Sequence, residues 1–237
     1  IGILQRIISI GDFDHIKAVI LAPTRELAIQ ITDVANNLSK YTKIKSMCAI
    51  GGVSIYDNIR KLRENNINLL IGTPGRILHL CEKNYISMEN IRILILDEVD
   101  EMFSIGFKEQ IYNIFQYLPP NAADCQVGFF SATIQENTLI FGNKILNNPV
   151  RVFVKESEIT LEGITQFYID VKKEHWKIHT LLDIYEKLTI NQAIIYTNTK
   201  KKANEIQYIL EENGHTVACI HSGLSQEERN DIIHKYR

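Results

Sequence analysis

Three carboxylates follow one apolar segment of the chain. Asp97, Glu98 and Asp100 come directly after residues 93–96, which read Ile-Leu-Ile-Leu. Nucleotide hydrolases need this layout, because an Asp at a strand end binds hydrated Mg²⁺ and an adjacent carboxylate orients or deprotonates the attacking water. Short acidic strings also occur as solvated turns, so these residues by themselves leave both interpretations open.

Hydroxyl and guanidinium side chains recur after two other apolar segments. The two motifs are Pro23-Thr24-Arg25 and Thr73-Pro74-Gly75-Arg76. A helix start carries unpaired amide groups, so each motif is an anion site in outline. Either one alone is also consistent with an ordinary capped helix start. Two in one chain favour phosphates in a row, as in a polynucleotide backbone.

Two smaller motifs also follow apolar segments. Gly51 and Gly52 would let the backbone approach a ligand closely. Ser131 and Thr133 carry small hydroxyl groups that could bond a neighbouring carboxylate such as Asp100. Each of these motifs would be an unremarkable turn if it stood alone.

The elements that position these residues follow one repeating pattern, an apolar or β-branched run, a polar turn, and then a segment of helical period. This pattern predicts an α/β fold with a mostly parallel sheet, whose ligands bind at the carboxyl ends of the strands. The expected strands are 18–22, 45–50, 68–71, 91–96, 126–130, 150–154, 165–171, 192–197 and 216–220. The expected helices are 26–40, 55–64, 76–82, 106–117, 177–187, 200–213 and 225–236, with Asn213-Gly214 as a helix end.

Composition excludes several classes of protein. The 237 residues are 45% hydrophobic and 23% charged, which is typical of a folded globular chain. The formal charge of −2 gives no overall basic field, so any polyanion site must be local. Four cysteines without a Cys-x-x-Cys pair indicate neither zinc nor a disulfide framework, and favour a reducing, intracellular compartment. No apolar run reaches the roughly 20 residues of a membrane span.

A charged stretch with a glycine divides the chain. Residues 155–164 are the expected linker between a first domain, 1–154, and a second block, 165–237. The second block holds only three strand-helix units, which is few for a doubly wound sheet. We therefore expect the second domain to be incomplete in this chain.

Taken in order, these motifs resemble those of a known family. Pro23-Thr24-Arg25, Gly51-Gly52, Thr73 to Arg76, Asp97 to Asp100 and Ser131 to Thr133 are similar to the first RecA-like domain of DEAD-box ATP-dependent RNA helicases. Asn198-Thr199 and Gln226 to Arg229 resemble motifs of the second domain. Details such as Leu161 to Ile164 and Trp176-Lys177 look most like the subgroup of eukaryotic translation initiation factor four-A and its relatives. The resemblance implies two RecA-like parallel-sheet domains in tandem.

For catalysis, the resemblance implies that ATP and Mg²⁺ are the cofactors. Asp97 would bind the metal, largely through water, and Glu98 would be the general base for ATP hydrolysis. Asp100, together with Ser131 and Thr133, would couple the nucleotide state to closure of the two domains.

For RNA, the resemblance implies a clamp that grips the backbone of a single strand between two closing domains and locally unwinds short duplexes. Contacts to phosphate and to the ribose hydroxyl would select RNA over DNA with little sequence preference. The implied contact residues are Pro23, Thr24, Arg25, Gly51, Gly52, Thr73, Pro74, Gly75, Arg76, Asn198, Thr199, Gly223, Gln226 and Arg229.

The resemblance also implies partners and a place of action. Single-stranded or short duplex RNA and a scaffold protein of the translation-initiation type would be the partners of a monomeric protein without membrane contact. The expected location is the cytoplasm, with the nucleus as the alternative.

Departures from the family pattern qualify these expectations. Val99 stands where the family has Ala, and we expect it to be tolerated because no charge is lost. No Gly precedes a Lys, so the phosphate loop is missing, and the motifs expected after Arg237 are missing too. We expect these 237 residues alone not to hydrolyse ATP. The alternatives are a truncated or ATPase-inactive RNA-binding clamp that acts with protein partners and, less favoured, a RecA-like DNA helicase or translocase.

Overall fold

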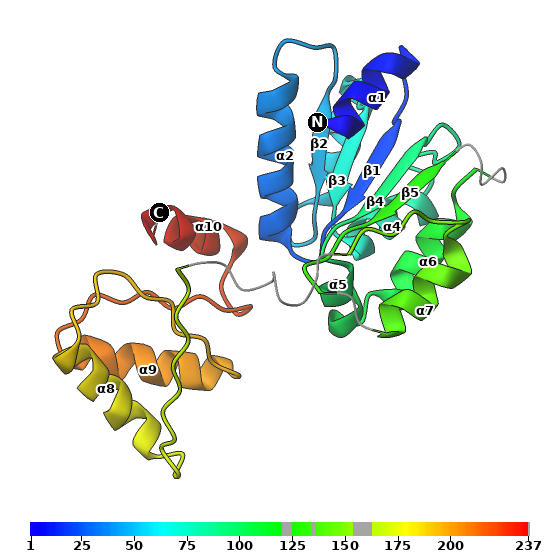
Figure 1. Ribbon diagram of the computed structural model, residues 1–237. Helices are drawn as coiled ribbons and strands as arrows, with labels where there is room; N and C mark the ends of the chain where they lie inside the picture. The colour runs from blue at the N-terminus through cyan, green and yellow to red at the C-terminus, as the bar shows by residue number, and fades with distance from the viewer. Residues whose placement is uncertain (120–124, 134–135, 154–162, 237) are drawn as a thin grey trace. The chain divides into compact units, whose positions relative to one another are not determined.

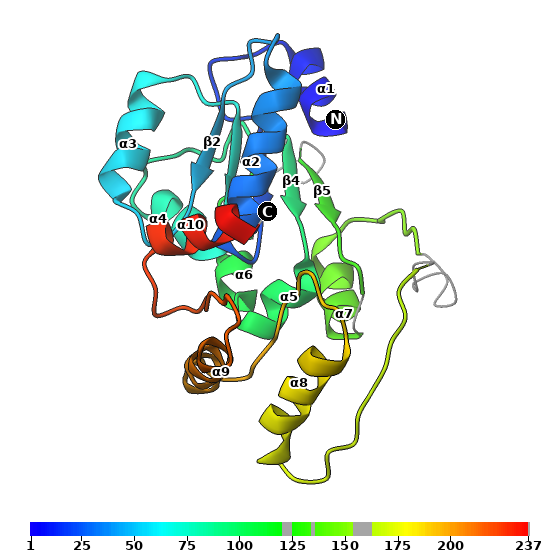
Figure 2. The same cartoon turned by 90° about the vertical axis from the view of Figure 1, so that its left-hand side faces the viewer.

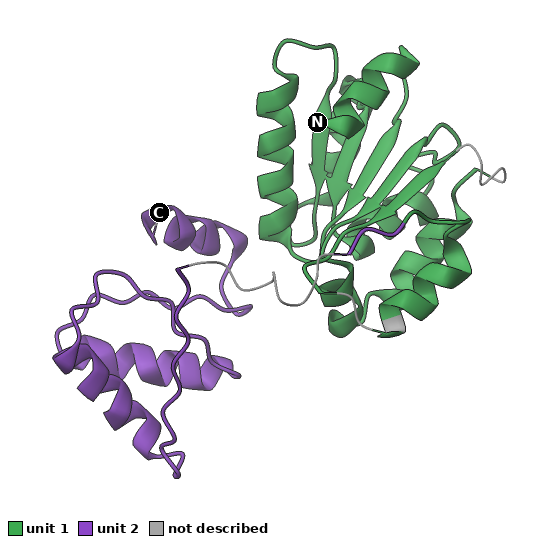
Figure 3. Cartoon of the chain, in the orientation of Figure 1, with its two compact units in different colours: residues 1–150 green, residues 151–237 purple. Residues whose placement is uncertain are grey.

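The computed structural model describes residues 1–119, 125–133, 136–153 and 163–236. The chain divides into two compact units, residues 1–150 and 151–237 (Figure 3). The expected linker, 155–164, lies almost entirely outside the described residues, so its position remains a prediction. No helix among the described residues is both long and apolar enough to cross a bilayer.

The first unit is built on a five-stranded sheet in which every neighbouring pair is parallel (Figure 1). The strands are β1 (Ala18–Leu21), β2 (Ser46–Ala49), β3 (Leu69–Gly72), β4 (Ile93–Leu96) and β5 (Gln126–Phe129). Their order across the sheet is β2-β3-β1-β4-β5. The parallel sheet is confirmed, and each of these strands lies within its expected segment or one residue beyond it.

Helices connect the strands of the first unit. They are α1 (Gly2–Ile10), α2 (Arg25–Ser39), α3 (Ile55–Glu64), α4 (Pro74–Glu82), α5 (Val99–Ile105), α6 (Lys108–Gln116) and α7 (Glu136–Ile145). In the turned view, α2 lies in front of the strands (Figure 2), and Figure 1 shows α6 and α7 on the opposite side of the sheet.

Two apolar clusters cover the two faces of the sheet, because successive side chains of a strand point to opposite faces. Ala18 and Ile20 of β1 pack with α1 and α2, whereas Val19 and Leu21 pack with α4 to α7. All four residues of β1 are buried, as expected for a strand covered on both sides. Packing on both faces of the sheet therefore holds in place the strand ends at which the candidate site lies.

The expected helix 106–117 is present as α6, Lys108–Gln116. Gly106 ends α5 in a left-handed conformation, with φ of 97°, and α6 begins at Lys108. Two helices were not anticipated, namely α5 at Val99 and α7 at Glu136. α5 begins within the acidic motif itself, and α7 comes after the segment of Ser131 and Thr133. Residues that the sequence assigns to the site therefore contain or precede these two helix starts.

The second unit contains α8 (Trp176–Lys187), α9 (Lys200–Glu212) and α10 (Gln226–Tyr236). Asn213 caps α9 and Gly214 follows with φ of 83°, which confirms the expected helix end. The strands expected at 165–171, 192–197 and 216–220 are wrong, because the described residues there form no ladder. Residues 150–153 form no strand either.

Candidate functional site

The acidic motif lies at the carboxyl end of β4, as expected. The Asp97 amide donates to the Leu21 carbonyl of the neighbouring strand at 2.9 Å. Glu98 then takes a left-handed conformation, with φ of 51° and ψ of 51°, and α5 begins at the next residue. A non-glycine residue in this region carries strain, which is common where a side chain must be aimed.

Asp97 lies where a cation would be stabilised. Burial raises the pKa of the Asp97 carboxyl, and the nearby charge of Glu98 raises it further. The Glu98 amide donates to Asp97 Oδ1 at 3.2 Å and offsets part of this effect. Mg²⁺ usually keeps several waters and takes one or two protein carboxylates, so a half-buried Asp with an acidic neighbour fits such an ion.

Asp100 is held by hydroxyl groups from two later segments. Its side chain is only 4% exposed, and Thr133 Oγ1 donates to Asp100 Oδ2 at 3.2 Å. Thr138 of α7, itself buried, donates to Asp100 Oδ1. The expected pairing of Asp100 with Thr133 is present in the structure. Ser131 is half-buried at the end of β5, and its role remains a prediction.

Thr138 is a residue that the sequence interpretation missed. A threonine inside a helical segment gives no motif signal, and its contact with Asp100 spans 38 positions of the chain. The bond joins α7 directly to the acidic motif. Because both partners are buried, leaving either one unpaired would carry a desolvation cost of about 1–3 kcal/mol.

Val99 is fully buried within the apolar cluster beneath the sheet. Its amide donates to the Phe130 carbonyl at 3.1 Å, which ties the motif to the end of β5. The extra methyl groups therefore lie in the core rather than among the carboxylates. Tolerance of Val at this position remains a prediction.

Arg25 meets the glycine turn that follows β2. A side chain at Gly52 would collide with the Arg25 guanidinium, and one at Gly51 would lie 3.6 Å from Arg25 Nη2. Gly52 also has φ of 80°, which disfavours any other residue. The two glycines thus leave room for the guanidinium to lie against the backbone.

Arg76 reaches the same turn from α4. Its Nη1 donates to Asn58 Oδ1 at 2.5 Å, and its Nη2 donates to the Val53 carbonyl at 2.7 Å. Burial lowers the pKa of Arg76, and the charge of Arg25 lowers it further. Both guanidinium groups thus lie at the turn of Gly51 to Val53, where an anion would be attracted to them.

Asn58 is the second residue that the sequence interpretation missed. It is 4% exposed on α3, and its Nδ2 donates to the Cys48 carbonyl at 3.3 Å. This bond orients the amide so that its oxygen faces Arg76. The only signal in the sequence was a polar residue on the inner face of a predicted amphipathic helix.

The helix starts beside these arginines are well formed. Thr24 Oγ1 accepts the Leu27 amide at 3.2 Å and caps α2, after Pro23. Pro74 occupies the first turn of α4, Thr73 precedes it as the cap position, and Gly75 has open space around its Cα. The structure records no capping bond from the Thr73 hydroxyl. The expected first-unit RNA residues therefore gather at the carboxyl ends of β1, β2 and β3.

In the second unit, the expected residues lie at two helix starts. Thr199 Oγ1 accepts the Lys202 amide at 3.2 Å and caps α9, next to Asn198. Gln226 begins α10 and its Nε2 donates to Asn230 Oδ1 at 3.1 Å. The Arg229 amide donates to the Ser225 carbonyl at 3.2 Å on the same helix.

Gly223 lies just before that helix. Its amide donates to His221 Nδ1 at 3.1 Å, and the other ring nitrogen of His221 lies 3.1 Å from Asn204 Oδ1. A side chain at Gly223 would lie 3.0 Å from the His221 ring. The two units are described separately, so a joint contact of first-unit and second-unit residues remains a prediction.

Comparison with known proteins identifies relatives of this chain. Residues 1–140 match the family model of the DEAD/DEAH box helicases, and residues 176–237 match that of the helicase conserved C-terminal domain. ATP-dependent RNA helicase FAL1 of Scheffersomyces stipitis is 42% identical over 237 residues, and eukaryotic initiation factor 4A of Caenorhabditis elegans is 41% identical over 237 residues. All of this chain is covered in both cases, and 58% of each relative.

Solved structures are similar as well. Dbp5 of S. cerevisiae bound to RNA and ADP BeF3 has a TM-score of 0.83 and 32% sequence identity. The match covers 94% of this chain and 56% of that chain. A DEAD box protein from Methanococcus jannaschii has a TM-score of 0.56 at 31% identity, with 94% of this chain and 58% of that chain covered. The chain thus spans somewhat over half the length of these relatives.

Proposed function

This chain belongs to the DEAD/DEAH box helicase family, and from this premise we propose that it is part of an ATP-dependent RNA helicase. The protein clamps single-stranded RNA between two RecA-like domains and locally unwinds short duplexes. The observation that carries the proposal is that Arg25 lies against the turn of Gly51 and Gly52 and that Arg76 donates to the Val53 carbonyl of the same turn. Guanidinium groups at neighbouring strand ends attract the phosphates of a polynucleotide backbone.

ATP hydrolysis is assigned to the carboxylates after β4. Asp97 would hold hydrated Mg²⁺, since a cation would offset the burial of its carboxylate and the nearby charge of Glu98. When bound, the metal ion and ATP supply an electrophilic phosphoryl group. Glu98 accepts the proton of the attacking water. Its backbone is left-handed, with φ of 51°, at the position where the chain passes from β4 into α5.

Asp100 connects the acidic motif to two other segments of the first unit. Its two oxygens accept from Thr133 after β5 and from Thr138 of α7, so any shift of the acidic motif must move or break these bonds. We assign to this network the coupling between nucleotide state and domain closure.

RNA binding is assigned to the helix starts of α2 and α4 in the first unit and of α9 and α10 in the second. Contacts with phosphate and ribose give affinity without sequence reading. The first-unit contacts are Pro23, Thr24, Arg25, Gly51, Gly52, Thr73, Pro74, Gly75 and Arg76. The second-unit contacts are Asn198, Thr199, Gly223, Gln226 and Arg229.

The role in the cell is proposed from the relatives. Initiation factor 4A is among the proteins that cover the whole chain, so we assign the protein to translation initiation, with a scaffold protein as its partner. One solved relative is Dbp5 bound to Gle1, which supports the use of a protein partner. The cytoplasm is the proposed location and the nucleus the alternative.

The RNA assignment is tested by fluorescence anisotropy with ten labelled uridines and, as comparison, ten deoxyuridines. We expect the chain to prefer the RNA. Arg25→Ala should weaken binding several-fold and reduce the slope of log affinity against log salt by about 0.7, the value for one lost contact to a single strand. Arg63→Ala, an exposed arginine on α3, is the matched control. Equal loss from both variants, or equal binding of DNA, would refute the assignment.

The ATPase assignment is tested on the longest polypeptide that the gene encodes, with Glu98→Gln as the variant. Loss of a general base should lower RNA-stimulated ATP hydrolysis by about 10²- to 10⁴-fold while RNA binding is kept. Unchanged hydrolysis would exclude Glu98 as the base. No hydrolysis by the unaltered polypeptide, together with intact RNA binding, would favour the alternative of an ATPase-inactive clamp.

A further inference from the structure

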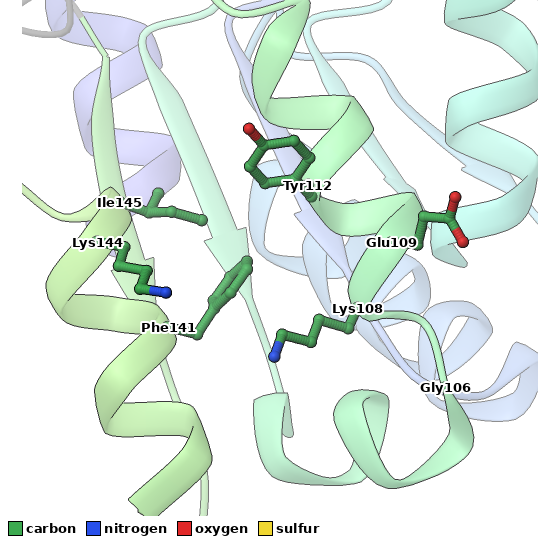
Figure 4. Close-up of a pocket in the computed structure, with 7 residues that line it drawn as sticks. All are labelled: Gly106, Lys108, Glu109, Tyr112, Phe141, Lys144 and Ile145. Carbon is green, nitrogen blue, oxygen red and sulfur yellow. The ribbon is translucent and has the colours of Figure 1, made fainter.

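A hollow of the first unit lies between α6 and α7, apart from the helix starts of α2 and α4. It is an open depression of about 480 Å³ and is shown in Figure 4. The lining residues come from the end of α5, from α6 and from α7. They are Gly106, Lys108, Glu109, Tyr112, Phe141, Lys144 and Ile145. None of them belongs to the acidic motif or to the proposed RNA contacts.

Two lysines bracket the hollow. In Figure 4 the side chains of Lys108 and Lys144 reach from opposite helices toward the Phe141 ring, whereas the Glu109 carboxylate points away from it. Lys108 Nζ lies 6.0 Å from the centroid of that ring. Among the residues that the structure describes, neither lysine has an ion-pair partner. Both ammonium groups are therefore available to an acidic ligand.

The floor between the lysines is apolar. Phe141 is buried and packs edge-on against Phe103 at a centroid distance of 4.8 Å, so its position is fixed. Tyr112 is 54% exposed beside it, and Ile145 is half-buried. A rigid apolar floor with an exposed aromatic side chain offers an anchor for one apolar side chain of a partner.

We propose that this hollow docks an acidic segment of a partner protein, with one apolar side chain on the Phe141 floor and carboxylates facing Lys108 and Lys144. Charge complementarity favours an acidic, partly apolar segment, because the two lysines lie on either side of an apolar floor. They do not form a row of cations. An RNA backbone would need cations or amides spaced along a track. The hollow presents only two cations, and the outer face of α6 carries the negative charge of Glu109.

The proposal does not depend on the ATPase or on RNA clamping. Its residues lie on α6 and α7, whereas the proposed RNA contacts of the first unit lie at the starts of α2 and α4 and at the turn after β2. Failure of the RNA assignment would therefore not exclude the docking proposal, and the reverse also holds. Arg25→Ala tests RNA binding, whereas Lys108→Glu with Lys144→Glu tests docking.

The test uses fluorescein-labelled twelve-residue peptides in an anisotropy titration of the 237-residue chain. One peptide places a single Phe between two pairs of Glu; in the matched peptides, Lys replaces Glu or Ala replaces Phe. We expect the acidic Phe peptide to bind more tightly than either matched peptide. The double variant Lys108→Glu, Lys144→Glu should weaken its binding about tenfold or more, because two attractions become repulsions.

Controls separate a specific hollow from a general charge effect. Lys43→Glu with Lys83→Glu changes the net charge equally at two other exposed lysines of the first unit and should leave binding unchanged. Tyr112→Ala removes the exposed aromatic wall without touching the buried Phe141 and should weaken binding several-fold.

Three results would overturn the proposal. They are no preference for the acidic Phe peptide, equal weakening by the two charge-reversal pairs, and loss of RNA binding in Lys108→Glu, Lys144→Glu while peptide binding is kept. The last result would assign the hollow to RNA. RNA binding that is unchanged in this variant, with peptide binding lost, would support the proposal.

Discussion

Two apolar segments of the chain differ in whether they form a strand. Residues 93–96 form β4, paired on both sides with β1 and β5, whereas the apolar residues 194–196 form no strand. Ile93 and Leu94 are buried, but Ile194 is 59% exposed. The difference lies in the neighbours: a strand exists only through hydrogen bonds to another strand, while a helix closes its bonds within itself.

The helices of the two units confirm this distinction. α9 forms with its cap at Thr199 much as α2 forms with its cap at Thr24. Yet Leu210 is the single buried hydrophobic residue among those described in the second unit. The second unit therefore has local structure without a comparable core.

The largest expected effect is in hydrogen exchange. Amides of β1, β3 and β4 should exchange at least about 10⁴ times more slowly than in an unstructured peptide, because they open only with the fold of the first unit. Amides of 192–197 should exchange within about tenfold of the unstructured rate. Slow exchange at 192–197 would contradict the contrast with β4, because it would require that this segment has hydrogen-bond partners.

The next largest effect is expected from truncating an apolar side chain. It should destabilise the first unit more than the second. Leu94→Ala removes a fully buried side chain of β4 and should cost about 2–5 kcal/mol in the free energy of unfolding of the first unit. Ile195→Ala, at 36% exposed, should cost less than about 1 kcal/mol. Urea unfolding followed by circular dichroism measures both, and the fluorescence of Trp176, the single tryptophan of the chain, follows the second unit. Equal costs would contradict the difference in burial between the described residues of the two units.

Helix caps should instead show equal effects. Thr24 and Thr199 each accept the amide three residues later at 3.2 Å. Replacing either with Ala should cost its helix about 0.5–2 kcal/mol, since the bond is local. Helix content and the urea midpoint of the corresponding unit report the loss. Thr24→Ser and Thr199→Ser keep the hydroxyl and should restore most of it; a cap effect in only one unit would show that the caps are not equivalent.

The smallest effect concerns pH and the acidic motif. Burial raises the pKa of Asp97 above its ordinary value of 3.8, so the folded chain binds this proton more tightly than the unfolded chain. That contribution to stability is complete below pH 3.8 and is lost as the pH rises through the pKa of the folded state. Asp97→Asn should therefore raise the melting temperature at pH 7, and the gain should shrink toward pH 4.

Asp183→Asn, an exposed acidic residue of α8 in the second unit, is the control for this measurement. It should give no comparable gain at pH 7. A melting temperature of Asp97→Asn that is equal to or below that of the unaltered chain at pH 7 would show that the carboxylate is already compensated.

Much of the first unit could be predicted from the sequence, because β1, β3 and β4 are continuous apolar runs bounded by Gly, Pro or Asp. The segments 18–22 and 68–71 illustrate this, as the observed strands β1 and β3 differ from them by one residue. The same rule failed at 165–171, 192–197 and 216–220. Apolar composition identifies a segment that suits a sheet, but pairing depends on partners that the local sequence does not contain.

The candidate site shows the same limit. Asp97, Glu98 and Arg25 were identifiable because their motifs stand at strand ends. Thr138 and Asn58 were not, since each acts through a contact far away in the chain, with Asp100 and with Arg76. Residues that hold functional groups in place are therefore harder to identify from the sequence than the functional residues themselves.

The bond from Thr138 to Asp100 has a thermodynamic consequence. Thr138 and Phe141 lie three positions apart on α7, about one helical turn, so the acidic motif and the floor of the hollow share one rigid element. Linkage is reciprocal: if an occupant of the hollow shifts the equilibrium position of α7, nucleotide at the strand ends must change the affinity for that occupant by the same factor. Through α7, two ligands that never touch would communicate in both directions.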